Sequence, residues 1–254
     1  MDRVLHNFNG AHFRRIVDRS NAVVSEHAHD WPVLSIFVIG GYSNTTELDR
    51  ISIFGPSAIL YRAGAAHQND IGPTGFEQIE IEFDPDWLGR RLLSPMPVSR
   101  WIGGWAARAS RELARTCVAE TDEATVRTAV RRFIEAGRHH APRPRPSWVD
   151  WIDARLRRDP NVKLRDIAES LGRHPSYLGT AYRLATGEAA AQVAARMRVE
   201  RAANLLRESD TVAAMIAADA GFFDQSHMIR TFRRVLGRTP SDVRADRAFM
   251  RESA

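Results

Sequence analysis

The sequence of 254 residues has little cysteine, little lysine and no long apolar run. Its single cysteine, Cys117, can form neither an internal disulfide nor a multi-cysteine zinc site, which favours a reducing compartment. No apolar stretch reaches the roughly 18 residues that a membrane-spanning helix needs, and the first residues have no apolar core of signal-peptide length. Because 44% of the residues are hydrophobic, we expect a globular protein in the cytoplasm, with no membrane partner.

Positive charge is carried almost entirely by arginine, since Lys163 is the only lysine among 36 basic residues. The net charge of +5 is unevenly distributed. Residues 1–140 hold 16 basic and 17 acidic side chains, whereas residues 141–254 hold 20 and 14, so the two parts carry −1 and +6. The planar guanidinium suits phosphate groups and base edges, although a GC-rich genome would give the same arginine usage.

A proline-rich stretch, residues 141–147, divides the chain, because alternating prolines neither continue a helix nor enter a central strand. Up to Asp84, short apolar runs and the alternating segment 76–83 predict strands. Residues 101–140 show helical periodicity, with Thr121 as a helix cap, and so does the chain beyond the prolines. Turn chemistry is predicted at Gly40-Gly41, Gly55-Pro56 and Ile71-Gly72-Pro73.

These patterns predict a multidomain protein with an N-terminal all-β barrel, a helical pair and a C-terminal all-α domain. The predicted boundaries are 1–97 for the barrel, 98–140 for the helical pair, 141–147 for the linker and 148–254 for the helical domain.

The C-terminal part contains an internal repeat. Its members recur 49 or 50 residues apart, and they are Ile167, Ala168, Gly172, Leu178, Tyr182, Arg183 and Gly187 in the first copy and Ile216, Ala217, Gly221, Met228, Phe232, Arg233 and Gly237 in the second. A small residue at the helix crossing and a glycine in a short turn are typical of a helix-turn-helix.

In both copies the apolar residues at i and i+4 of the second helix would face inward and leave the opposite face to DNA. The candidate DNA-binding residues are Ser176, Thr180 and Arg183 in the first copy, and Gln225, Ser226, His227 and Arg230 in the second. Residues 188–207 are predicted to form one connecting helix of ~30 Å, close to the ~34 Å of one B-DNA turn. A bundle in which the repeat serves only packing is the alternative, and the two copies and basic bias argue against it.

Residues from about 148 to 244 resemble the DNA-binding domain of AraC/XylS-type bacterial transcription regulators. The resemblance is carried by the stretch from Gly221 to Arg234 and by the closing turn Gly237-Arg238-Thr239-Pro240. It implies that Gln225, Ser226, His227 and Arg230 lie where the family reads bases, and that Arg233 and Arg234 lie near phosphates. In the first copy, Gly179 lacks a side chain and Ser176 and Thr180 are short, so that helix is expected to position the protein mainly through phosphates.

Residues from about 12 to 84 are similar to the cupin-like sensor domain usual in this family. The similarity is carried by His27-Ala28-His29 before an apolar strand and by Gly64-Ala65-Ala66-His67. Leu34 stands where metal-binding cupins have a glutamate, and Arg62 replaces the usual proline. Three interpretations stay open for His27, His29 and His67: a site for zinc, iron or another divalent ion, a metal-free effector pocket, and a purely structural role. Glu77, on the apolar face of its predicted strand, is a candidate replacement carboxylate.

The resemblance implies a regulator that binds double-stranded DNA, responds to a small-molecule effector in its N-terminal domain, and is not an enzyme. No cofactor is favoured. The helical pair is a candidate seam for a homodimer, or else it covers the barrel. The alternatives are a cupin metalloenzyme fused to a DNA-binding domain and a constitutive DNA binder with a vestigial sensor domain. The sequence names neither effector nor operator nor the direction of regulation, although activation is the expected direction.

Overall fold

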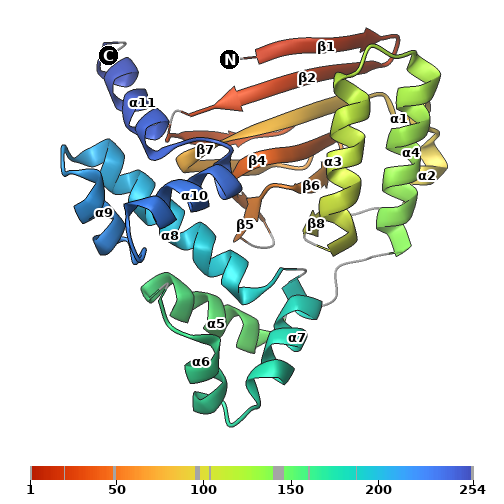
Figure 1. The fold of residues 1–254 in the computed structure, drawn as a ribbon. Helices are drawn as coiled ribbons and strands as arrows, with labels where there is room; N and C mark the ends of the chain where they lie inside the picture. Colours follow the sequence, from red (N-terminus) through yellow and green to blue (C-terminus); the bar gives the residue numbers. More distant parts are fainter. Residues whose placement is uncertain are drawn as a thin grey trace. The chain divides into compact units, whose positions relative to one another are not determined.

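The computed structural model describes residues 2–19, 21–47, 50–94, 98–102, 104–139, 146–159, 161–186 and 188–252, with side chains up to residue 246. The chain divides into two compact units, residues 1–142 and 143–254 (Figure 1). Most of the predicted linker, residues 141–145, and Gly187 of the repeat lie outside the described residues. Among the described helices, none has the length and apolar character needed to cross a bilayer.

The first unit is built on a fully antiparallel sheet, as the strand patterns predict. Within the described residues its main path runs β1-β2-β7-β4-β6-β8, with β3 paired to β7 and β5 to β4. The strands are β1 (Asp2–Phe8), β2 (Ala11–Asp18), β3 (Val23–His27), β4 (Val33–Thr46), β5 (Arg50–Phe54), β6 (Ser57–Tyr61), β7 (His67–Phe83) and β8 (Ser99–Ile102).

Two of the predicted turns lie inside long strands instead of between short ones. The Gly40-Gly41 pair belongs to β4 at a point where its register with β7 shifts. Gly40 has a φ of +64°, and a Cβ there would lie 2.0 Å from the carbonyl oxygen of Gly75, so only glycine allows the strands to meet. Gly72-Pro73 lies within β7 between its paired stretches, where a proline removes no ladder bond. The glycines therefore bend the strands without ending them.

The sheet is buried on both faces. One face packs with two helices into an apolar core that holds Leu34, Ile36, Ile79, Ile81 and Phe83. The other face encloses a second core, made of Val33, Phe37, Tyr42, Ile53, Ile59, Tyr61, Ile71 and Phe76. Neighbouring residues along β4 and β7 therefore point into different cores.

Two short helices, α1 (Pro85–Leu88) and α2 (Arg90–Leu93), lead to β8, and the predicted helical pair follows as α3 (Gly104–Val118) and α4 (Glu123–His139). Because β8 pairs with β6, the sheet continues beyond the boundary predicted at residue 97. The cap of α4 is Asp122 and not Thr121, since its Oδ1 accepts a hydrogen bond of 2.9 Å from the Thr125 N–H.

The second unit is all-α, as predicted. Its described helices are α5 (Ser147–Arg158), α6 (Leu164–Ser170), α7 (Pro175–Thr186), α8 (Ala190–Glu208), α9 (Ala213–Asp219), α10 (Gln225–Leu236) and α11 (Pro240–Glu252). The helices α5, α6 and α7 share an apolar core with the first half of α8. The unit thus holds two helix-turn-helix pairs, α6–α7 and α9–α10, joined by α8 (Figure 1).

Candidate nucleic-acid interface and effector pocket

The two helix-turn-helix turns have the same backbone geometry. Gly172 and Gly221 both have positive φ, +61° and +83°. In each turn the glycine N–H and the next N–H donate to carbonyls of the first helix, over 3.0 and 2.9 Å in the first copy and 3.0 and 2.8 Å in the second. This pattern satisfies carbonyls at a helix end. The glycines at these positions are therefore needed for the turn, as the repeat predicts.

The predicted inward face of each pair is buried. Ala168 and Ala217, at the helix crossings, are fully buried, and so are Met228 and Phe232 of α10. Their counterparts on α7, Leu178 and Tyr182, are also buried. Close packing at this face leaves only the opposite arc of each second helix open to a ligand.

The outward arc of α10 is dominated by arginine. Asp224 caps the helix, since its Oδ1 accepts a 2.6 Å hydrogen bond from the His227 N–H. Among the predicted DNA-binding residues of this helix, His227 is half-buried. The others are exposed, and they are Gln225, Ser226, Arg230, Arg233 and Arg234. The His227 ring is engaged locally, because its Nδ1 accepts from the Phe223 N–H over 3.3 Å. Burial lowers the pKa of Arg198 on α8, and the nearby Arg234 adds to that effect.

The outward arc of α7 holds the predicted Ser176, Thr180 and Arg183, all exposed. It also holds Tyr177 and Leu184, which are 62% and 74% exposed and which the sequence analysis did not single out. The sequence does contain a signal for this exposed pair, because a spacing of seven residues places both side chains on one side of a helix.

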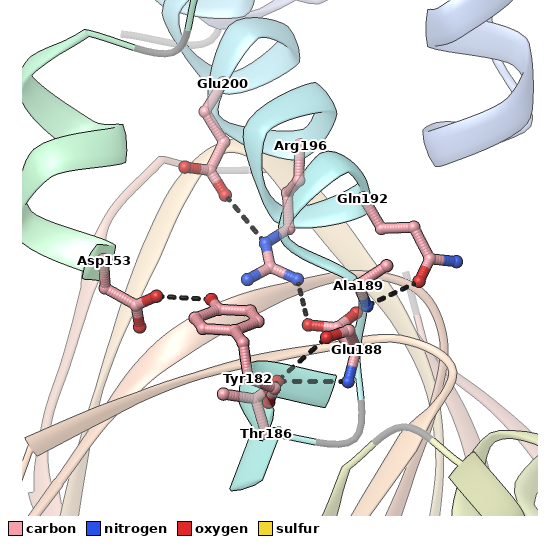
Figure 2. A network of polar contacts seen from close by, with 8 residues as sticks. All are labelled: Asp153, Tyr182, Thr186, Glu188, Ala189, Gln192, Arg196 and Glu200. Carbon is pink, nitrogen blue, oxygen red and sulfur yellow. Dashed lines mark hydrogen bonds and ion pairs between the residues drawn. The ribbon is translucent and has the colours of Figure 1, made fainter. Parts of the chain in front are cut away.

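A polar network joins the end of α7 to α5 and to the segment that leads into the connecting helix (Figure 2). The Thr186 hydroxyl of α7 donates to the Glu188 carbonyl over 3.0 Å and accepts from the Glu188 N–H over 3.2 Å. The Tyr182 hydroxyl of α7 donates to Asp153 of α5 over 2.5 Å. At the start of α8, Arg196 pairs with Glu188 at 2.8 Å and with Glu200 at 4.0 Å. The Ala189 N–H donates to Gln192 over 3.0 Å, which caps the helix. The predicted connector is therefore a helix that begins at Ala190, about 28 Å long at 1.5 Å per residue.

The closing Gly-x-Thr-Pro turn joins two helix ends. Gly237 has a φ of +67° and ends α10. Thr239 and Asp242 then cap α11 reciprocally, because each side chain accepts from the other's N–H, at 3.2 and 2.7 Å. Pro240 occupies the first helical position, where no N–H is needed.

In the first unit the predicted histidines come together. His27 and His67 are register partners between β3 and β7, and His29 follows β3 directly. The ring centroids of His27 and His67 lie 4.4 Å apart, and those of His29 and His67 lie 5.4 Å apart. The rings line a cavity of about 160 Å³. Its other residues are Ile16, Asp18, Val24, Ser35, Tyr42, Tyr61, Asn69, Ile71, Phe76, Gln78 and Glu80.

Backbone carbonyls fix the orientation of two imidazoles. The Nδ1–H of His27 donates to the Ser25 carbonyl over 2.9 Å, and that of His67 donates to the Ala65 carbonyl over 3.0 Å. Each ring therefore presents Nε2 as its acceptor atom. Burial, together with the neighbouring histidines, lowers the pKa of His67 to about 4 despite the Ala65 carbonyl, and burial lowers that of His29. The His67 ring is thus neutral near pH 7 and offers an acceptor nitrogen to the cavity.

The structure does not bring Glu77 to the histidines. Its carboxylate lies away from the cavity and pairs with Arg15 at 2.9 Å. Glu80 lines the cavity instead and pairs with Arg14. Glu77 lies on the apolar face of its strand, as predicted, but this face packs with the helices, and the face of Gln78 and Glu80 lines the pocket.

The three imidazoles fit a divalent transition-metal ion. One ligand atom from each of His27, His29 and His67 lies within 4.8 Å of the others. Metal-binding histidines are usually held at the second ring nitrogen by a carbonyl or carboxylate, as His27 and His67 are here. Such a set would leave coordination positions open to a further ligand.

Comparison with known proteins identifies the second unit. The helix-turn-helix domain family matches residues 167–246. The regulatory protein SoxS of Salmonella typhimurium is 31% identical over 96 residues, which are 38% of this chain and 88% of SoxS. An AraC-like transcription regulator of Streptomyces lividans is 33% identical over 91 residues, 35% of this chain and 30% of that protein's length.

Among solved structures, ToxT from Vibrio cholerae is similar at 12% identity and a TM-score of 0.41, over 93% of this chain and 98% of ToxT. The match to SoxS spans 88% of that protein, and the family match covers the repeated helix-turn-helix unit whose turns, caps and outward faces are described above. The chain therefore belongs to the AraC-type family of helix-turn-helix, DNA-binding transcription regulators.

Proposed function

We propose that this regulator recognises a specific operator through both second helices, with α10 as the stronger reader, and that its activity is controlled by a small molecule bound among the histidines. The observation that carries the first part is the outward arc of α10, where Arg230 is exposed between the turn and two further arginines. An exposed arginine on such a helix can pair with guanine through two hydrogen bonds. The proposed contacts are Ser176, Thr180, Arg183, Gln225, Ser226, His227, Arg230, Arg233 and Arg234.

The experiment begins with selection of binding sequences from a random duplex pool by the full-length protein. Arg230→Ala is then titrated against the selected duplex and a scrambled one. A base contact predicts a loss of about 1–3 kcal/mol on the selected duplex and a smaller loss on the scrambled one. Equal losses on both would reassign Arg230 to phosphate binding, and failure to select any sequence would contradict operator recognition.

The support for effector binding is the cavity that the three imidazoles line, because small-ligand sites are concave and hold a few convergent polar groups. A thermal-shift screen over small molecules tests it. Stabilisation of the wild type that is lost in His67→Ala and kept in His139→Ala, at an exposed helix end, supports the proposal. Turnover of a stabilising compound would favour the enzyme alternative, and no stabilisation by any compound would favour the constitutive binder.

A metal ion is a second candidate occupant, since one ligand atom from each imidazole lies within 4.8 Å of the others. Metal analysis of protein purified without a histidine tag is the test. Protein that arrives metal-free and rejects added zinc and iron would exclude this candidate and leave the metal-free pocket.

Self-association, a cytoplasmic location and activation of transcription complete the proposal. A groove of about 580 Å³ between α3 and α4, lined in part by Ala109, Leu113, Ala129 and Phe133, supports a dimer seam. A dimer would raise operator affinity through effective concentration. Analytical ultracentrifugation of the full chain tests the dimer, and a reporter gene tests the direction of regulation.

A further inference from the structure

The two second helices expose different chemistry at matching positions of the repeat. On α10 the outward residues Ser226, His227, Arg230, Arg233 and Arg234 include three arginines. The residues of α7 at the same positions, 50 earlier, are Ser176, Tyr177, Thr180, Arg183 and Leu184, with one arginine. The first copy therefore has Thr180 and Leu184 where the second has Arg230 and Arg234, so two guanidinium groups are replaced by a methyl-bearing hydroxyl side chain and an apolar one.

The apolar groups on α7 form a stripe. Tyr177, Thr180 and Leu184 stand at i, i+3 and i+7, which places them on one side of the helix. Tyr177 is 62% exposed and Leu184 is 74% exposed, and Thr180 is exposed as well. The core is filled from the opposite side by Leu178 and Tyr182, so packing within the unit does not require the stripe.

The position of the stripe identifies its occupant as DNA. It lies on the outward arc of the second helix of a helix-turn-helix, which enters the major groove in this motif. It also lies beside Ser176 and Arg183, which suit a phosphate flank. The one apolar group on a base edge in the major groove is the thymine C5-methyl, which threonine methyls and other apolar side chains contact.

We propose that α7 reads its half-site by van der Waals contact of Tyr177, Thr180 and Leu184 with thymine methyl groups, whereas α10 reads its half-site by hydrogen bonds. The proposal rests on the operator recognition proposed above. It replaces the expectation that α7 acts mainly through phosphates, and it predicts an operator whose α7 half-site is rich in thymine.

The test removes the methyl groups from the DNA. The full-length protein first selects its operator from a random duplex pool, and footprinting of wild type and Arg230→Ala assigns the two half-sites. Deoxyuridine then replaces thymidine in one half-site at a time. Each contacted methyl lost from the α7 half-site is expected to weaken binding about fourfold. In the α10 half-site, 7-deazaguanine, which lacks the N7 acceptor, is expected to weaken binding more than deoxyuridine does.

Protein variants connect the effect to the stripe. Thr180→Ser removes the side-chain methyl and keeps the hydroxyl, and Thr180→Val does the reverse. The uridine penalty in the α7 half-site should shrink in Thr180→Ser and in Leu184→Ala but persist in Thr180→Val. It should also persist in Arg230→Ala, the control on α10. The three substituted positions are exposed, and urea unfolding confirms that each of the four variants folds.

No uridine penalty in the α7 half-site of the wild type, or an equal penalty in wild type, Thr180→Ser and Leu184→Ala, would overturn the proposal. Undiminished operator affinity in both of these variants would instead assign the stripe to a protein partner and would also overturn it. If the pool yields no selected sequence, the proposed operator recognition itself fails, which distinguishes the two failures.

Discussion

At the scale of single residues, Gly221 is constrained in two ways and its counterpart Gly172 in one. Both have positive φ, which disfavours any residue with a side chain. A Cβ on Gly221 would in addition lie 2.3 Å from Nδ2 of Asn161, in the segment between α5 and α6, whereas a Cβ on Gly172 would meet no atom within 4 Å. Gly221 is therefore also held by close contact with the segment between α5 and α6.

Gly221→Ala should lower the free energy of unfolding by about 1–3 kcal/mol, because the Asn161 side chain must also move away from the new Cβ at a strained φ. Gly172→Ala should cost only about 1 kcal/mol, since backbone conformation alone is affected. Urea unfolding of both variants measures the difference. Asn161→Ala should recover part of the loss in the Gly221→Ala background and none in the Gly172→Ala background. Equal losses for the two glycines would contradict the packing argument.

Cys117 is predicted to be unreactive in the folded protein. It is fully buried, and burial raises the pKa of its thiol from an ordinary value of 9.0 to about 12. Because the thiolate is the nucleophile, the reactive fraction at pH 8 falls about a thousandfold. Alkylation by iodoacetamide, followed by mass spectrometry, should be slow for the native protein and fast in urea. Rapid stoichiometric labelling without urea would contradict this prediction.

Residues whose role follows from local spacing could be predicted from the sequence. The inward pair Met228 and Phe232 is an example, because an i, i+4 spacing on a helix decides which side each residue takes. Glu77 could not be placed, because alternation in β7 separates two faces without telling which one lines the pocket. The contact between Asn161 and Gly221 joins segments 60 residues apart, and no local pattern indicates it.

At the scale of elements, a buried arginine near the start of α8 holds the residue that precedes this helix against it. Arg196 lies between two carboxylates, and its side chain is only 14% exposed. Burial alone would lower the pKa of its guanidinium, but Glu188 and Glu200 outweigh burial and raise it. The arginine is therefore charged at every pH at which the protein folds, and its removal would leave Glu188 without this partner.

Arg196→Met should lower the free energy of unfolding by about 3 kcal/mol, the cost of breaking a buried ion pair from one side. Arg196→Lys, which keeps the charge and loses the planar fork, should cost less. Arg201→Met, at an exposed position of the same helix, should change stability by no more than about 0.5 kcal/mol. Chemical unfolding monitored by circular dichroism provides the measurement. Similar losses for Arg196→Met and Arg201→Met would mean that the network contributes little.

The bounds of secondary-structure elements could be predicted where the apolar residues follow one period, and less well where a strand bends. The connecting helix predicted over residues 188–207 is observed as α8, Ala190–Glu208, because helical apolar spacing is a local signal. Glycine and proline in β4 and β7 indicated turns, yet the strands continue through register shifts. The same residues serve turns and bulges, and only the pairing with distant strands decides between them.

At the scale of the whole molecule, the two compact units differ in net charge. The net charge is −1 over residues 1–140 and +6 over residues 141–254. Nonspecific DNA affinity depends on the phosphates that a protein neutralises, and log K falls with log salt by about 0.9 for each. The second unit should therefore supply nearly all of the salt dependence.

A fragment of residues 143–254 is predicted to bind a random-sequence duplex with the same salt slope as the full chain. Both proteins are titrated from 50 to 200 mM salt, and the slopes are compared at protein concentrations where each is monomeric. The isolated first unit, residues 1–142, serves as the control and should not bind. If the slope of log K against log salt were steeper for the full chain than for the fragment by one or more, the first unit would also contact phosphates.

Strand β7 runs for 17 residues from His67 to Phe83, and the shifts in its pairing with β4 do not end it. Its first residue lines the histidine cavity, and its last belongs to the core shared with α3 and α4. Between these ends, Gln78 and Glu80 line the cavity while Ile79 and Ile81 enter that core, so the cavity and the helical layer lie on opposite faces of one strand. A ligand that displaces the pocket face of β7 would move the helix-packing face with it, because no loop lies between the two.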